Sequence, residues 1–216
     1  MLKFKNITTN EKKPHLNNLN LNVSNGKFIL LNYRSKTEKD KIIDLICQLD
    51  IPKSGGIIIG GKNLSKFNCR SKIIHKRIGI CFEDFKLIQT KDVMGNITLP
   101  LEIHTKLPPK KLIETGEKQL KNFGLLDKKN NSLTTLNLEE KQRLNIARSL
   151  VLDPELIILD NPQIHLKIEK IESLMKYFQD LNSKGKTIVI FTNNKKIENM
   201  INCDKYILEK GAISNV

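Results

Sequence analysis

The sequence predicts one α/β domain that has a mixed sheet and a largely antiparallel first half. Apolar runs of strand length alternate with segments of helical spacing through the second half of the chain. In the first half, short stretches alternate apolar and polar residues, as strands with one solvated face do. A length of 216 residues suits one substantial domain with room for a lobe.

The expected strands of the first half are short and are separated by turns. Alternation or a buried apolar run predicts each of them, at 1–7, 19–23, 28–31, 57–59 and 78–82. Clusters of Gly, Pro, Asn and Ser predict turns at 25–26, 52–56 and 60–61. A helix at about 39–48 is expected to follow the third strand.

The second half has a clearer alternation of helices and strands. Apolar residues at helical spacing predict helices at 108–126, 138–151 and 168–181. Gly124 and Gly185 are placed to end the first and the last of these. Apolar runs predict buried strands at 156–159, 187–191 and 206–208, and Asp160 ends the first.

The basic balance of the chain has two interpretations. A net charge of +14 and a pI of about 9.6 would suit a nucleic acid or an anionic membrane surface as partner. The lysines form no dense tract and are not interleaved with aromatic residues, so nucleic acid is not the expected partner. Abundant Lys, Asn and Ile point instead to an AT-biased genome, and both interpretations remain open.

Cysteines and histidines give no sign of a metal cluster. The four cysteines, Cys47, Cys69, Cys81 and Cys203, form no C-x-x-C pair, and the four histidines, including His75, are isolated. No signal peptide opens the chain, and its apolar runs fall far short of the roughly 18 residues that a membrane span needs. The chain is therefore expected to be cytoplasmic and to reach a membrane only through a partner.

One segment lies where a phosphate-binding loop should be. The expected strand at 28–31, a tight loop and a helix supply the context of the P-loop pattern G-x-x-x-x-G-K-[ST]. Laid over 33–40, that pattern matches only at Lys39. Tyr33 and Glu38 replace its glycines, and Asp40 replaces the Mg²⁺-binding hydroxyl. The positions of this candidate nucleotide loop are Tyr33, Arg34, Ser35, Lys36, Thr37, Glu38, Lys39, Asp40 and Lys41.

Several further segments, in a fixed order, carry a resemblance to a known family. They are Pro52 with Ser54 and Gly55; Ile78, Gly79, Phe82, Asp84 and Leu87; Val93, Asn96, Ile97, Leu99, Pro100 and Leu101; 124–127; Gln142, Arg143 and 146–150; and Asp153, Pro154, 156–160 and Pro162. Over essentially its whole length, the chain resembles the ATP-binding subunit of ABC transporters. It looks most like the FtsE-type cell-division branch, with lipoprotein-export relatives next.

This resemblance implies a P-loop NTPase fold of the ABC type. The whole chain, 1–216, would be one nucleotide-binding domain with a mixed central sheet and an antiparallel β subdomain. A helical lobe at about 84–150 would be inserted in the α/β core. ATP with Mg²⁺ would be the cofactor, with Asp160 on the metal if nucleotide binds.

At most functional positions the chain departs from the family pattern. No aromatic residue at 9–14 can stack on adenine. Glu83 stands where a glutamine should sense Mg²⁺ and water, and Asn161 stands where a glutamate should polarise the attacking water. Asn161 cannot accept a proton at neutral pH. Lys167 replaces the interface aspartate and Asn193 replaces the switch histidine.

The signature segment departs as well, and it has a structural interpretation. Leu136, Asn137, Leu138, Glu139 and Glu140 replace L-S-G-G-E. Asn137 with Glu140 three residues later has the form of a capping box, so a plain helix start explains this segment better than phosphate binding. Glu38 and Asp40, like Glu139 and Glu140, would bring the chain's own anions to a helix N-terminus.

The altered positions favour an FtsE-like subunit that has lost its catalytic activity. By resemblance, the segment at about 83–107 would dock on an integral membrane partner of the FtsX type, in cell division or another envelope process. A homodimer or heterodimer is possible within the family. Three alternatives stay open: a weakly active ATP-binding subunit of an export complex, a basic protein repurposed for nucleic-acid or membrane-surface binding, and a decaying gene.

Overall fold

The computed structural model describes residues 1–64 and 77–215. The chain forms two compact units. One joins Met1–Ile74 to Met175–Val216, and the other is His75–Leu174. Cys69 and His75, named above for their spacing, lie outside the described residues.

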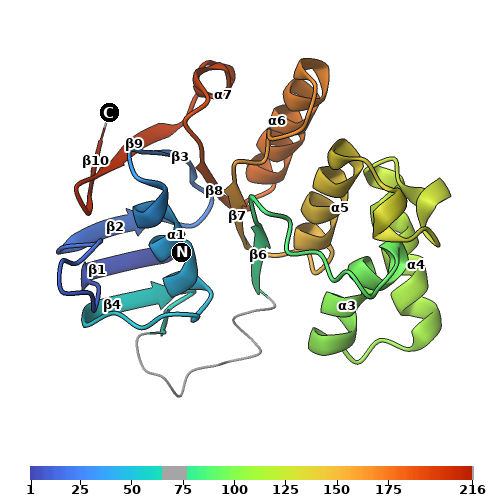
Figure 1. The fold of residues 1–216 in the computed structure, drawn as a ribbon, viewed down its shortest axis with the longest axis horizontal. Coiled ribbons are helices and arrows are strands. Elements are labelled where there is room, and N and C mark those ends of the chain that lie inside the picture. Colours follow the sequence, from blue (N-terminus) through green and yellow to red (C-terminus); the bar gives the residue numbers. More distant parts are fainter. Residues whose placement is uncertain (65–76, 216) are drawn as a thin grey trace. The chain divides into compact units, whose positions relative to one another are not determined.

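An antiparallel sheet opens the first unit (Figure 1). Its strand order is β2-β1-β4-β5, with β1 at Leu2–Thr8, β2 at Leu19–Val23, β4 at Ser54–Ile59 and β5 at Lys62–Asn63. Alternate residues of β1 and β2 are buried, so one face of this sheet packs on a core, as the alternation predicts. Strand β4 begins three residues earlier than the apolar run at 57–59.

A second group of strands in the same unit is mixed. Strand β3, Phe28–Tyr33, runs parallel to β8, Thr187–Phe191, and to β9, Asp204–Glu209. Strand β10, Ala212–Asn215, pairs antiparallel with β9 and was not expected from the sequence. Every residue of β8 is buried, which accounts for its continuous apolar run.

Helix α1 follows β3 and begins earlier than predicted. It spans Lys36–Ile46, against the expected 39–48. Ser35 is the reason, because its side-chain oxygen accepts the Glu38 N–H as an N-cap. The helix buries Ile42, Ile43, Leu45 and Ile46.

In its described residues, the second unit includes a parallel pair of strands and a group of helices. Strand β6, Ile78–Cys81, pairs with β7, Leu156–Asp160. The helices are α3, Val93–His104, α4, Pro109–Asn122, and α5, Leu138–Leu150. Short 3-10 turns lie at Leu126–Lys128 and Leu133–Thr135. The predicted helix at 108–126 therefore ends sooner, and α3 had not been assigned as a helix.

The helical part of this unit has its own apolar core. Leucines, valines, isoleucine and alanine from α3, α4, α5 and the turns between them form one buried cluster. Its members are Leu87, Val93, Ile97, Leu101, Leu120, Leu125, Leu133, Leu136, Leu144, Ala147 and Val151. Helix α5, which contributes to this cluster, also packs directly on β6.

Two further helices complete the chain. Helix α6 covers Ile168–Ser183, and α7 covers Lys195–Met200 with Asn194 as its N-cap. Within residues 1–64 and 77–215, none of the helices has the length and hydropathy that crossing a bilayer requires.

Candidate functional site

The connection between β3 and α1 is only two residues long, Arg34 and Ser35. The remaining positions of the candidate nucleotide loop belong to regular structure: Tyr33 ends β3, and Lys36 to Lys41 form the first turns of α1. No residue from Tyr33 to Lys41 has a positive φ. The chain therefore makes a short capped turn here, without the left-handed backbone that glycines would allow.

Lys39 is fully buried and is engaged by its neighbours. Its ammonium lies 3.1 Å from Asp40 Oδ1 and 5.4 Å from the centroid of the Tyr33 ring. An ammonium taken out of water needs such partners, a carboxylate and an aromatic face, to offset its desolvation. The one residue that matches the P-loop pattern thus has its charge satisfied inside its own segment.

Of the two acids expected at this helix N-terminus, only Glu38 lies in the first turn of α1. Asp40 lies further along, because Ser35 starts the helix at Lys36. Its carboxylate forms an ion pair with the Lys39 ammonium and does not lie at the N-terminal end of the helix dipole.

Segment 9–14, where no adenine-stacking residue was found, is tied to α1 by charge. Lys41 Nζ lies 2.8 Å from Glu11 Oε1 and 2.8 Å from Asp50 Oδ2. The hydrogen bond from Lys41, with a smaller contribution from Thr9, lowers the pKa of Glu11 to about 2. Its two carboxylate partners, Asp50 first, raise the pKa of Lys41.

Asn193, which stands at the switch-histidine position, contacts the start of the loop. Its Oδ1 accepts the Tyr33 N–H at 2.9 Å. The backbone N–H of Arg34 donates to the Leu208 carbonyl at 3.0 Å. The start of this short turn is therefore held by protein groups of the same unit.

In the second unit, the ends of β6 and β7 bring Glu83, Asp160 and Asn161 together. The strands are parallel with Cys81 opposite Leu159, so the residues that follow emerge at one edge. Asn161 Nδ2 donates to Glu83 Oε2 at 3.0 Å and to Asp160 Oδ1 at 3.4 Å. One amide group thus bridges two carboxylates, and Gln163 Nε2 donates to its oxygen at 3.2 Å.

Buried side chains of α5 support this edge from beneath. Gln142 Nε2 donates to the Pro162 carbonyl at 2.8 Å. Asn145 Nδ2 donates to the Phe82 carbonyl at 2.7 Å and to Cys81 Sγ at 3.1 Å. Burial, with a smaller contribution from Asp160, raises the pKa of the Cys81 thiol, so this cysteine is neutral. The two α5 amides hold the segments that carry Glu83 and Asn161.

The signature positions form the capping box that the sequence predicts. Asn137 Oδ1 accepts the Glu140 N–H at 2.9 Å, and Glu140 Oε2 accepts the Asn137 N–H at 2.9 Å. Lys128 also pairs with Glu140, and its hydrogen bond, followed by that of Asn137, lowers the pKa of Glu140. Leu136 is buried and Leu138 is exposed. Lys167, at the interface position, is exposed directly before α6.

Sequence reasoning missed several of these contacts. The pairing of Glu11 with Lys41 joins residues thirty apart, and nothing in local spacing indicates it. Gln142 and Asn145 lie among the buried residues of α5, most of which are apolar. Two amides among these apolar residues were the signal that the sequence offered. Within the described ranges 1–64 and 77–215, no group of three or more His, Cys, Asp or Glu side chains could hold a metal ion.

Together, the strand–turn–helix segment, the β6–β7 edge and the helical lobe define an ATP-binding cassette. The family model of the ABC transporter matches residues 16–164, and the chain belongs to this family. A dimeric structure of the ATP-binding cassette MJ0796, bound to ADP and Pi, is similar with a TM-score of 0.91 and 27% identity. That similarity covers 99% of this chain and 97% of that one. The predicted fold class is thereby confirmed.

Two kinds of curated relative match at similar identity. The methionine import ATP-binding protein MetN of Pasteurella multocida (strain Pm70) is 29% identical over 231 residues, covering 100% of this chain and 66% of MetN. The cell division ATP-binding protein FtsE of Bacillus subtilis (strain 168) is 30% identical over 202 residues, covering 92% of this chain and 87% of FtsE. The chain thus spans about two thirds of the MetN length. These identities do not distinguish the two branches.

Proposed function

We propose that this chain is an FtsE-like ABC subunit that docks on an FtsX-like membrane protein and works without hydrolysing ATP. Its place would be at the inner face of the plasma membrane, in cell division or another envelope process. Family membership supports the subunit role, because subunits of this family dimerise and pair with membrane permeases. The proposed loss of hydrolysis rests on Lys39 and on the β6–β7 edge. The FtsE-like assignment rests on segment 83–107.

The observation that carries the proposal is the buried ammonium of Lys39. A phosphate that replaced Asp40 and the Tyr33 ring would first have to extract this charge from its present partners. Phosphate cradles also need inward-pointing backbone N–H groups, which glycines supply. Here Ser35 Oγ accepts the Glu38 N–H, and Glu38 adds a negative charge beside it. The residues present therefore fit a phosphate poorly.

The β6–β7 edge supports the same conclusion. Its three polar groups satisfy one another, with the Asn161 amide between the carboxylates of Glu83 and Asp160. An amide at 161 cannot take a proton from water. Asp160 would hold Mg²⁺ only together with a nucleotide, so no step of hydrolysis is assigned to these residues.

The docking part of the proposal rests on segment 83–107. Asn96 is fully buried, and its amide binds Ile88 twice, donating to the carbonyl at 3.1 Å and accepting the N–H at 2.8 Å. Arg148 donates to the carbonyls of Phe85 and Lys86, which both have positive φ. The segment is thus rigidly built, and a rigid surface loses little entropy on binding.

Apolar side chains are exposed on and next to this segment. They are Ile88, Ile103, Leu107 and Ile113. Exposed apolar residues that form one contiguous patch indicate a binding surface for another protein, and the proposal requires these four to form one. The sequence Val93 to Leu101, which carries the FtsE-type resemblance, forms most of α3, the helix that also carries Ile103.

Isothermal titration with Mg-ATP tests the nucleotide part. We expect no heat of binding and no thermal shift up to millimolar nucleotide. Lys39→Met should leave the unfolding free energy unchanged or raise it by about 1 kcal/mol, because the desolvation cost of the buried ammonium is removed while the Asp40 side chain, 48% exposed, stays hydrated.

Two results would contradict this part. Micromolar binding of Mg-ATP that is lost in Lys39→Met would show that Lys39 leaves its internal partners to hold phosphate. Steady ATP turnover abolished by the same variant would establish a weakly active ATPase, the principal alternative.

Co-purification with a membrane protein of the FtsX type, expressed from the same genome, tests the docking part. Ile103→Glu with Leu107→Glu should abolish it. Leu49→Glu is the matched control, since Leu49 is 74% exposed but belongs to the first unit. Equal recovery of all three proteins would rule out segment 83–107 as the docking surface.

A further inference from the structure

Helix α4 of the second unit carries more positive than negative charge, and its acids are already bound. Its sequence contains four lysines and two glutamates. Glu114 pairs with Lys111 at 2.9 Å, and Glu117 pairs with Lys129 of the following turn at 2.6 Å. The charge that remains on this helix for a partner is therefore positive.

The other three lysines of α4 lie on one side of the helix. They are Lys110, Lys118 and Lys121, and all three are exposed. At 3.6 residues per turn, their directions fall within a sector of about 80° around the helix axis. In the part of the chain that the structure describes, none of these ammonium groups has a carboxylate partner. Like charges gathered in this way attract an anionic surface.

An apolar side chain is exposed next to these charges. Ile113 is 48% exposed and follows Lys110 by three residues, a spacing that makes the two side chains neighbours on a helix surface. Lys106 and Leu107, shortly before the helix begins, are exposed as well. Basic and apolar side chains together suit the headgroup region of an anionic bilayer. We call Lys110, Ile113, Lys118 and Lys121 the α4 face.

A nucleic acid fits the α4 face less well than lipid does. Single strands bind by stacking their bases on aromatic side chains, and the sequence of α4 contains no aromatic residue. Phosphates alone would also leave the exposed part of Ile113 in water. A bilayer surface offers anionic headgroups to the lysines and apolar chains to the isoleucine.

The proposed docking surface lies beside the α4 face. Segment 83–107 ends two residues before α4 begins, and α3 packs against α4 (Figure 1). Ile113 is also one of the four exposed apolar residues of that surface, so the two surfaces adjoin. A segment docked on an integral membrane protein would bring α4 close to the surrounding bilayer. This step rests on the proposed function, whereas the charge and exposure of α4 do not.

We propose that the α4 face binds the anionic headgroups of a membrane surface. Lys110, Lys118 and Lys121 lie on lipid phosphates, and Ile113 lies between headgroups. The contact is peripheral, because Leu120, on the other side of the helix, is buried in the apolar core of its own unit. Binding is therefore reversible and weakens as salt rises.

Co-sedimentation of the purified protein with lipid vesicles tests the proposal. We expect binding to phosphatidylcholine vesicles that contain phosphatidylglycerol, and none to vesicles of phosphatidylcholine alone, at about 0.1 M salt. Lys118→Gln with Lys121→Gln should weaken the binding about 25-fold, roughly fivefold for each lysine near an anionic surface.

A variant that keeps the charge tests the apolar contribution. Ile113→Asn should weaken vesicle binding about fivefold, because about half of the isoleucine side chain remains to be buried on binding. Leu49→Asn is the matched control, since Leu49 is 74% exposed in the first unit, and it should bind as the unmodified chain does.

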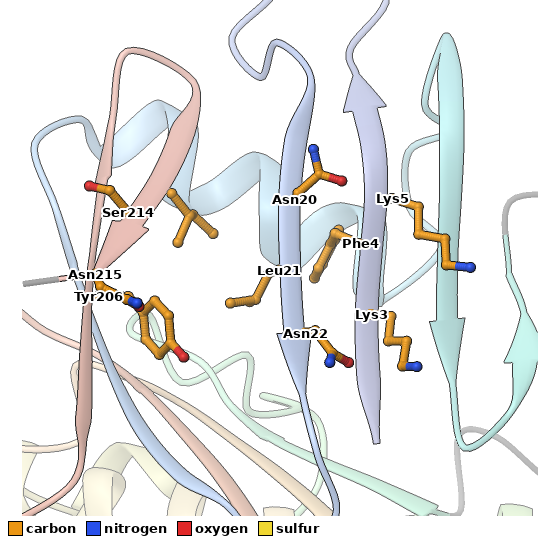
Figure 2. A pocket seen from close by; sticks show the side chains of 10 residues that line it. Lys3, Phe4, Lys5, Asn20, Leu21, Asn22, Tyr206, Ser214 and Asn215 are labelled. Carbon is orange, nitrogen blue, oxygen red and sulfur yellow. The ribbon is translucent and has the colours of Figure 1, made fainter.

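Lys3→Gln with Lys5→Gln is the control for charge. Figure 2 shows both lysines on β1, beside an open groove of about 550 Å³ in the first unit, with side chains that lead toward β4. The exposed residues of the adjacent strand β2 are Asn20 and Asn22, so these lysines have amides as neighbours in place of an isoleucine. We expect this variant to bind vesicles almost as well as the unmodified chain.

Three results would overturn the proposal: equal weakening by the two lysine variants, unchanged binding of Ile113→Asn, or release from vesicles by oligothymidine at equal phosphate concentration. The first two would show attraction to charge alone, and the third would indicate a nucleic-acid surface. Thermal melts confirm that each variant is folded.

The vesicles contain no protein, so this test is independent of the docking experiment. An absence of vesicle binding would overturn the lipid contact and leave docking of segment 83–107 untouched. Vesicle binding without recovery of an FtsX-type protein would contradict the docking part alone.

Discussion

Glu83 and Asn161 each carry the functional group that the family resemblance implies for the other. A carboxylate stands where an amide is expected, and an amide stands where a carboxylate is expected. The two side chains meet at 3.0 Å, and Asp160 lies on the same amide nitrogen at 3.4 Å. The two replacements together keep the number of carboxylates at this edge constant. Either replacement alone would change that number.

A double-mutant cycle measures whether the two exchanges depend on each other. Asn161→Glu would place a new carboxylate beside Glu83 and Asp160 and remove the bridging donor. We expect a loss of about 2 kcal/mol in unfolding free energy from repulsion between buried like charges. Adding Glu83→Gln should restore most of it, as measured by urea denaturation.

The control for this cycle is Asn122→Glu with the same Glu83→Gln change. Asn122 is exposed at the end of α4, in the same unit but on a different element, so the two effects should add. Additive effects at Asn161 as well would contradict a compensated pair and would favour the decaying-gene alternative.

At the scale of elements, the β6–β7 pair depends on the absence of one side chain. A Cβ on Gly79 would lie 2.1 Å from the Ser149 carbonyl oxygen and 2.7 Å from Pro154 Cγ. Backbone and a proline ring cannot move aside cheaply. The close contact of β6 with the end of α5 therefore requires glycine at 79.

Gly79→Ala and Gly116→Ala should differ strongly in stability. We expect Gly79→Ala to cost at least about 2 kcal/mol through overpacking. At Gly116, in α4, the closest atom to a new Cβ is Met94 Sδ at 2.9 Å, on a flexible side chain. The gain in helix propensity of about 1 kcal/mol should offset that contact. Equal melting temperatures for the two variants would contradict this account.

The elements that the sequence predicted well are those whose pattern has one physical cause. Strands β3, β7 and β8 are buried along most of their length, so their apolar runs identify them. Helix α3 was missed because it is apolar on several sides and contains Pro100, which hides helical spacing. The early start of α1 had a signal, Ser35 followed by Glu38, which is the sequence form of an N-cap.

The candidate site was predictable only in part. The capping box of Asn137 and Glu140 depends on local spacing, and it was found. The burial of Lys39 depends on how Tyr33 and Asp40 fold around it, and sequence spacing contains no such information. The same holds for Asn161, whose partner Glu83 is 78 residues away.

At the scale of the whole molecule, the Glu11–Lys41 pair connects segments far apart in the first unit. The pKa of Glu11 is about 2 in the folded chain, below the ordinary 4.5. A carboxyl group whose pKa is lower in the folded chain than in the unfolded chain stabilises the fold at pH values above the unfolded pKa. That stabilisation is lost as pH falls from about 4.5 toward 2.

Thermal melts of the protein and of Glu11→Gln across this range test the pair. We expect the variant to melt lower than the unmodified chain at about pH 7, and the difference to disappear as the pH approaches 2. A difference that stays constant with pH would mean that Glu11 acts through packing alone. Glu114→Gln, from an exposed ion pair in the other unit, is the control and should change little.

The internal partners of Lys39 affect how the stability of this protein would depend on the ATP concentration in its cell. A ligand stabilises a fold in proportion to the logarithm of its concentration relative to its dissociation constant. Under the proposed function, with Asp40 and the Tyr33 ring already on the ammonium, that dependence would vanish for ATP. Starvation would then leave the conformation of this loop unchanged. The abundance of its partner, and not the energy supply, would then set how much of the complex assembles.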